Sequence, residues 1–168
     1  MRKGLLVAAP LAVALLAAGG WWYLQRAPST PAVGRVAPGF QLPSLDGKDM
    51  ALNDFRGRPV LVNIWATWCG PCKEEMPTLQ SASQSHPQLV VLGVDNAESA
   101  IVVRPYVNKV GVTFPILLDL DGSLIDRYRV VGTPTSYFVD KDGVMRAIHL
   151  GAMDAGTLKL ELAKIGVT

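Results

Sequence analysis

The chain has few of the residues that build disulfide scaffolds or metal centres. Its 168 residues include two cysteines and two histidines. A disulfide-stabilised scaffold is excluded, because small scaffolds of that kind carry several cysteine pairs. A structural zinc site usually takes four ligands, which two cysteines with the distant His86 and His149 supply poorly. We therefore expect no metal site and interpret both histidines as incidental.

The chain also lacks a strong charge of either sign. Its formal net charge is +2, and the excess belongs to the N-terminus. Without Arg2, Lys3 and Arg26, 13 basic residues stand against 14 acidic residues. Nucleic-acid-binding surfaces and surfaces that bind anionic membranes need a basic field. The sequence therefore gives no indication of nucleic acid as a partner.

One long apolar run is present, at the N-terminus. It extends from Gly4 to Leu24, 21 residues, which is about the length of a helix that spans a bilayer. Trp21, Trp22 and Tyr23 end it with an aromatic cluster, as is common at a membrane–water interface. The alternative is a cleaved signal peptide. The length and the aromatic cluster favour an uncleaved signal anchor over residues 1–26.

The charges around this run predict its orientation. The basic pair at Arg2 and Lys3 precedes the run, so the N-terminus should stay in the cytoplasm. The rest of the chain would then face the periplasm or its equivalent, as the outer part of a single-pass protein of the cell membrane. Residues 27–38, rich in proline and small residues, are interpreted as a linker, and residues 39–168 as one domain.

From residue 40 onward, apolar runs typical of strands alternate with helical patterns. Strands are expected at residues 40–42, 50–52, 59–66, 89–94, 115–118, 135–139 and 144–150. Helices are expected at residues 71–83, 98–110, 123–128 and 157–165. This alternation, ending in a hairpin, predicts an α/β fold in which helices cover both faces of a mixed sheet.

The two cysteines, Cys69 and Cys72, lie two residues apart in the run WCGPC. A loop this short removes little entropy from the unfolded chain, so a structural disulfide is a poor interpretation. Thiol–disulfide exchange is a better one. Cys69 follows a buried strand and precedes a helix, whose N-terminus lowers the pKa of a thiol. We therefore expect Cys69 to attack and Cys72, one turn further, to resolve the mixed disulfide.

The sequence around the cysteines resembles known proteins. The run Trp65 to Cys72 (WATWCGPC), with Pro77 eight residues after Cys69, resembles thioredoxin. Val131 to Thr135 (VGTPT) looks like the cis-proline loop of thioredoxin. With the N-terminal anchor and the run Lys73 to Pro77 (KEEMP), the chain is similar to the TlpA/ResA-like membrane-anchored thiol–disulfide oxidoreductases of the thioredoxin superfamily.

The resemblance covers about residues 36–168. It implies a thioredoxin-like fold with an N-terminal hairpin and an insertion at residues 96–118, preceded by one transmembrane helix. It implies no cofactor other than the redox-active disulfide between Cys69 and Cys72.

The chain departs from thioredoxin at one acidic position. Thioredoxin has a buried aspartate six residues before its first cysteine, and Asn63 stands there in this chain. The related anchored reductases carry a glutamate three residues after the second cysteine, and Glu75 occupies that position. Residues i and i+3 share a helix face, so Glu75 is expected near Cys72, able to move its proton. The alternative is a solvated carboxylate like Glu74.

The resemblance also implies a substrate surface around the cysteines. It is expected to include Trp68, Gly70 and Pro71, together with Thr133 and Pro134. A cis Thr133–Pro134 bond would turn the Thr133 backbone toward the cysteines, where it could pair with an extended substrate strand. The alternative is a trans proline in an ordinary loop.

By resemblance, the activity is expected to be reduction of protein disulfides outside the cytoplasm, with electrons from a membrane partner. The implied clients are apocytochrome c cysteines, or thiols of proteins that assemble copper sites. The alternatives are an oxidant or isomerase of periplasmic disulfides and a copper-binding assembly factor without turnover. A peroxidase would need a separate peroxidatic cysteine, which the chain lacks. The sequence does not identify the client or the electron donor.

Overall fold

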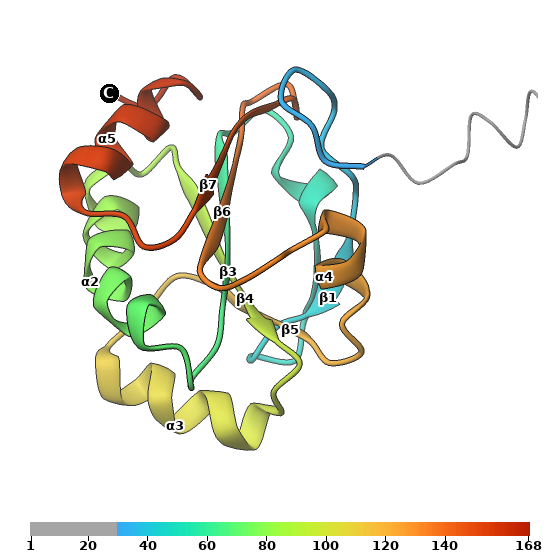
Figure 1. Ribbon diagram of the computed structural model, residues 1–168, viewed down its shortest axis with the longest axis vertical. Coiled ribbons are helices and arrows are strands. Elements are labelled where there is room, and N and C mark those ends of the chain that lie inside the picture. The colour runs from blue at the N-terminus through green and yellow to red at the C-terminus, as the bar shows by residue number, and fades with distance from the viewer. Residues whose placement is uncertain (1–29) are drawn as a thin grey trace, which may run out of the picture.

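The computed structural model describes residues 30–168. Their centre is a five-stranded mixed sheet with the strand order β5-β4-β3-β6-β7 (Figure 1). The strands are β3 (Val60–Trp65), β4 (Val90–Asn96), β5 (Ile116–Asp119), β6 (Thr135–Val139) and β7 (Met145–Leu150). The first three strands run parallel, whereas β6 is antiparallel to β3 and to β7.

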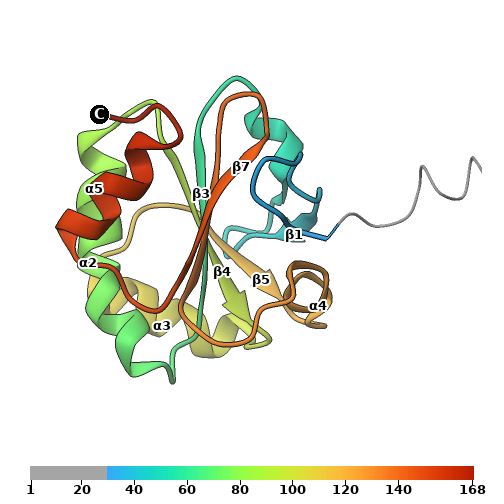
Figure 2. The ribbon, with the colours of Figure 1, turned by 45° about the horizontal axis from the view of Figure 1, so that its top comes forward.

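The remaining elements form a layer on each face of the sheet (Figure 2). One layer holds the helices α2 (Gly70–Ser85), α3 (Ala100–Val110) and α5 (Ala155–Ala163). The other holds α4 (Ser123–Tyr128), the 3-10 turn η1 (Leu52–Phe55), and the hairpin of β1 (Gln41–Pro43) and β2 (Asp49–Ala51). This arrangement gives the mixed α/β fold that the sequence predicts.

Strand β3 explains why the sheet needs cover on both faces. All six of its residues are buried, as in a strand that has helices or loops on either side. Leu61 and Trp65 belong to the core beneath α2, α3 and α5, whereas Val62 and Ile64 belong to the opposite core. Asn63 lies between Leu61 and Trp65 in this alternation, so it is a polar residue on the face that α2 covers.

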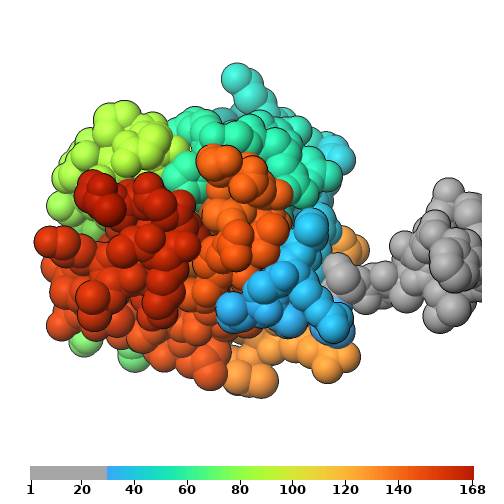
Figure 3. Space-filling view, turned by 90° about the horizontal axis from the view of Figure 1, so that it is seen from above, coloured from blue at the N-terminus to red at the C-terminus, as the bar shows by residue number. Residues whose placement is uncertain are grey.

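The first described residues belong to the folded unit, although the sequence suggests a linker up to residue 38. Val36 forms a β-bridge with Val144, and the Gly34 amide donates to the Met145 carbonyl at 2.8 Å. Ala37 and Pro38 are buried, and Figure 3 shows this segment lying against the β6–β7 hairpin. The folded part therefore begins before the expected boundary at residue 39, because residues 34–37 pair with residues 143–145, at and just before the start of β7.

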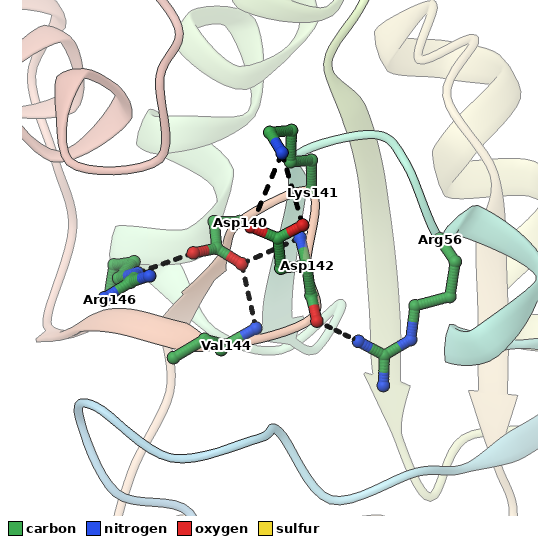
Figure 4. Close-up of polar contacts among 6 residues, drawn as sticks. All are labelled: Arg56, Asp140, Lys141, Asp142, Val144 and Arg146. Atoms are coloured by element: carbon green, nitrogen blue, oxygen red, sulfur yellow. Dashed lines mark hydrogen bonds and ion pairs between the residues drawn. The ribbon is translucent and has the colours of Figure 1, made fainter.

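The β6–β7 hairpin is closed by a polar network around Asp140 (Figure 4). One Asp140 oxygen accepts hydrogen bonds from the amides of Asp142 at 3.0 Å and Val144 at 2.9 Å. The other accepts from Arg146 Nε at 2.6 Å. Arg56, from the loop before β3, donates to the Asp142 carbonyl. An aspartate that bonds to the backbone ahead of it is a common way to fix a turn.

The strands and helices predicted from residue 40 onward are all present, and two of them, at residues 123–128 and 135–139, have the expected bounds. The turn η1 was not expected. The predicted membrane anchor, residues 1–26, lies outside the described residues. Within residues 30–168, no helix is both long and apolar enough to cross a membrane.

Candidate active site

Cys69 lies where β3 ends and α2 begins. Its backbone is extended, with φ −82° and ψ 109°, and it is the N-cap residue of α2. The Cys72 amide donates to Cys69 Sγ at a nitrogen–sulfur distance of 3.2 Å. Pro71 stands in the first turn, where the missing N–H would have no partner within the helix. The Cys69 sulfur thus faces the unpaired amides and the positive end of the helix dipole.

The two cysteines form a disulfide, with their Cα atoms 5.3 Å apart. Cys69 is 4% exposed and Cys72 is 2% exposed, so both cysteines are buried in the oxidised protein. Their neighbours are open to solvent: Trp68 is 65% exposed, and Gly70 and Pro71 are also exposed. These three residues therefore form an exposed surface next to the disulfide.

The loop that contains Pro134 lies at the same edge of the sheet as the disulfide. Thr135, the first residue of β6, pairs with Ile64 near the end of β3. Because β3 and β6 are antiparallel, the residues before β6 and those after β3 lie at one edge. The Thr133–Pro134 peptide bond is cis, as the resemblance implies. Pro134 is buried and Thr133 is half-buried.

Glu75 lies in the core and not in solvent. It is 1% exposed, whereas Glu74 is exposed. Neither Glu75 carboxyl oxygen has a hydrogen-bond partner among residues 30–168. Burial raises the pKa of Glu75 to about 7. The neighbouring Asn63 side chain and Met153 backbone lower the pKa by smaller amounts. The structure therefore does not support the alternative of a solvated carboxylate like Glu74.

Asn63 has a partner of its own beside Glu75. Its side-chain amide donates to the hydroxyl oxygen of Ser136 at 2.9 Å, across the β3–β6 pair. An amide neither gains nor loses a proton near neutral pH. Of these two residues, Glu75 is therefore the one that can exchange a proton, and it lies one helical turn from Cys72.

A second buried carboxyl near the site has no counterpart in the expectations from the sequence. Asp95, at the end of β4, is fully buried and lies opposite Trp65 in the β3–β4 register. Burial raises the pKa of Asp95 to about 8, and the neighbouring Glu98 carboxyl adds to the rise. Glu98 accepts hydrogen bonds from Thr67, two residues before Cys69. One signal in the sequence could have revealed Asp95. The run LVVLGVD at residues 89–95 has the pattern of a buried strand that ends in an acid, and this strand pairs with β3, which leads to Cys69.

The two histidines lie apart from one another, with His86 at the C-terminal end of α2 and His149 on β7. Within residues 30–168, no cluster of three or more His, Cys, Asp or Glu side chains could hold a metal ion.

Comparisons with known proteins agree with this geometry. Residues 33–148 match the AhpC/TSA family. The thiol–disulfide oxidoreductase ResA of Geobacillus thermodenitrificans is 35% identical over 136 residues, which are 80% of this chain and 78% of ResA. The thioredoxin-like protein YneN of Bacillus subtilis is 39% identical over 133 residues, 77% of this chain and 78% of YneN.

Solved structures give the same result. StoA from Bacillus subtilis has a TM-score of 0.66 and 30% identity, covering 79% of this chain and 99% of StoA. The thioredoxin domain of a thiol–disulfide oxidoreductase from Bacteroides vulgatus has a TM-score of 0.71 and 26% identity, covering 80% of this chain and 99% of that domain. Motif, fold and ancestry therefore agree, and the chain belongs to the AhpC/TSA family, among the TlpA/ResA-like thiol–disulfide oxidoreductases of the thioredoxin superfamily.

Proposed function

We propose that this oxidoreductase reduces disulfides of client proteins outside the cytoplasm, with Cys69 as the attacking thiol and Cys72 as the resolving thiol. The position of Cys69 carries the proposal. Its sulfur caps α2 and accepts a hydrogen bond from the Cys72 amide. A helix N-terminus stabilises a thiolate, and the thiolate is the nucleophile in disulfide exchange.

The reaction passes two electrons from the dithiol to the client. The Cys69 thiolate attacks one sulfur of the client disulfide, and the other client sulfur leaves as a thiolate. Cys72 then loses its proton and attacks Cys69 Sγ, which releases the second client sulfur. The products are a reduced client and the Cys69–Cys72 disulfide, which is the state of the described structure.

Glu75 is proposed to take the proton of Cys72 in the second step. It lies one turn further along α2, is buried, and has no competing hydrogen-bond partner within residues 30–168. A carboxyl with a pKa of about 7 is suited to accept and return a proton near neutral pH. Replacement by glutamine removes this capacity with little change of shape. We expect Glu75→Gln to slow resolution of the mixed disulfide near neutral pH, and Glu74→Gln to leave it unchanged.

The client is proposed to bind across the exposed residues beside the disulfide. Trp68, Gly70 and Pro71 surround Cys69, and the loop with Thr133 and Pro134 lies at the same edge of the sheet. A client segment that lies extended here would place its disulfide against Cys69 and could pair with the Thr133 backbone.

The direction and the location of the reaction belong to the same proposal. The apolar run before residue 26 would hold the domain at the outer side of the cell membrane, where a reductant needs electrons from a membrane partner. Relatives named ResA support a role as a thiol–disulfide oxidoreductase. Apocytochrome c or copper-site assembly proteins are the proposed clients, on the basis of the family resemblance.

Mixed-disulfide trapping tests the assignment of the two cysteines. Cys72→Ser should accumulate covalent complexes with client proteins that disappear on reduction with dithiothreitol, whereas Cys69→Ser should not. The double variant is the matched control for nonspecific capture. Accumulation in Cys69→Ser alone would reverse the roles, and the absence of complexes in both single variants would contradict the proposed mechanism.

A further inference from the structure

The loop that carries Cys69 is tied to a different part of the chain. Both Glu98 oxygens accept hydrogen bonds from Thr67, one from its amide and one from its hydroxyl, each at 2.6 Å. Thr67 stands two residues before Cys69, in the segment that leaves β3. A carboxylate that accepts from two donors on one residue fixes both the position and the rotation of that residue. The chain segment that leads to Cys69 is therefore fixed by Glu98, which lies just before α3.

Glu98 is itself held by the end of β4. Its amide donates to Asp95 Oδ1 at 2.9 Å. Asp95 is fully buried, and its second oxygen has no hydrogen-bond partner among residues 30–168. Between the two acids, Ala97 adopts a left-handed backbone with φ 62°. A non-glycine residue rarely adopts this conformation, so the turn depends on the contacts at both of its ends.

The sheet is buried and well packed at this position. Asp95 pairs with Trp65 in the β3–β4 register, and Trp65 is fully buried. The Trp65 ring lies against Tyr106 of α3, with ring centroids 5.6 Å apart. The connection from Asp95 through Glu98 to Thr67 thus joins the end of β4 to the segment between Trp65 and Cys69.

We propose that Glu98 is a positioning residue for disulfide exchange. It holds Thr67 so that the Cys69 sulfur stays at the N-terminus of α2, and Asp95, through the turn at Ala97, directs Glu98 toward Thr67. Glu98 does not touch the reacting sulfurs in this proposal and exchanges no proton with them. The inference rests on attack by Cys69 and is independent of the client and of the direction of electron flow.

Two pairs of variants separate positioning from the effect of charge. Glu98→Gln removes the negative charge and replaces one acceptor oxygen by an amide nitrogen. Thr67→Val removes only the hydroxyl donor and leaves every charge in place. Thr67→Ser keeps both donors and is the conservative rescue, and Glu74→Gln, an exposed change on α2, is the matched charge control.

The attack is measured in the Cys72→Ser background, where Cys69 is the single thiol. The probe is the aromatic disulfide dithiobis(nitrobenzoate), and the readout is the limiting second-order rate constant at high pH, where the thiol is fully ionised. Glu98→Gln and Thr67→Val should each lower this constant about tenfold, which corresponds to about 1.4 kcal/mol. Thr67→Ser and Glu74→Gln should leave it within about twofold, a loss under about 0.5 kcal/mol.

Amide hydrogen exchange at Thr67 provides the second readout. We expect exchange there to accelerate at least about tenfold in Glu98→Gln, since that amide loses its charged acceptor. Faster exchange with an unchanged limiting rate would overturn the proposal, because the loop would then be released without effect on attack. A shift of the Cys69 pKa in Glu98→Gln with no change in Thr67→Val would also overturn it, by reducing Glu98 to a charge effect.

The design separates this inference from the proposed function. If the Cys72→Ser protein fails to react with the probe at any pH, the assignment of Cys69 as the attacking thiol fails, and this inference fails with it. If the limiting rate constant is the same with and without the Glu98→Gln change, only the inference about Glu98 fails. Should Glu98→Gln not fold, the comparison of Thr67→Val with Thr67→Ser still decides the outcome.

Discussion

The buried carboxyl of Glu75 should make the stability of the oxidised protein depend on pH. Burial raises its pKa from the ordinary value of 4.5 to about 7. Each pKa unit corresponds to about 1.4 kcal/mol, so ionised Glu75 costs the folded state about 3 kcal/mol relative to the unfolded chain. Glutamine cannot ionise, so Glu75→Gln removes this cost.

The direction of the effect follows from the sign of the pKa change. Below about pH 4.5 the carboxyl is protonated in both the folded and the unfolded state, and the cost is absent. Between about pH 4.5 and about pH 7 the unfolded chain loses this proton while the folded protein keeps it, so the free energy of unfolding falls as pH rises. Above about pH 7 the full cost is present.

Urea denaturation of the disulfide-bonded protein measures this effect, because the Cys69–Cys72 bond then stays intact in both states. The free energy of unfolding of Glu75→Gln minus that of the wild type should increase by about 2 to 3 kcal/mol between about pH 5 and about pH 8.5. A buried glutamine amide also needs hydrogen-bond partners, but that cost is independent of pH and cancels in the comparison.

Glu74→Gln is the matched control, since Glu74 is exposed one position away on α2. Its difference from the wild type should change little over the same range. Parallel pH profiles for the wild type and Glu75→Gln would refute the argument, because Glu75 would then ionise as easily in the folded protein as in the unfolded chain.

Three further outcomes are expected. Burial raises the pKa of Asp95 to about 8, so wild-type stability should also fall from about pH 4 to about pH 8, and Asp95→Asn should remove that part of the loss in urea denaturation. Tyr128→Phe should lower the free energy of unfolding by about 1 to 2 kcal/mol, because the buried Tyr128 hydroxyl donates to the Pro38 carbonyl at 2.6 Å, whereas an unchanged value would mean that this contact contributes nothing. The full chain should remain in membranes after a salt wash, with a reporter after residue 168 active outside the cytoplasm, and release of a shortened soluble protein would indicate a cleaved signal instead.

The sequence predicted the strands well because their borders coincide with local signals. The strand at residues 135–139 is β-branched and aromatic, and Pro134 and Asp140 bound it on either side. The position of Cys69 at the start of a helix followed in the same way, from an apolar run, Cys69 itself and Pro71. Both inferences use residues that are neighbours in the chain.

The contacts that the sequence did not reveal join residues far apart in the chain. Residues 34–37 look like part of a linker because their composition is that of one, yet they pair with residues 143–145. Glu98 and Thr67 are separated by 31 positions, and no periodic pattern connects a loop residue with an acid at the start of another helix. The position of Glu75 near Cys72 was expected from a family motif, whereas its burial is a finding of the structure. Glu74 and Glu75 are the same residue type and differ only in the helix face they occupy.

The reduction potential of the Cys69–Cys72 pair tests the central proposal, reduction of client disulfides, most directly. It can be measured in redox buffers of dithiothreitol or glutathione, with the fraction of free thiol determined by alkylation at each ratio. The account predicts a reducing couple, near or below the value of about −270 mV that characterises thioredoxin. A potential of about −180 mV or higher, in the range of disulfide isomerase and DsbA, would contradict it and assign the protein to the isomerases or oxidants.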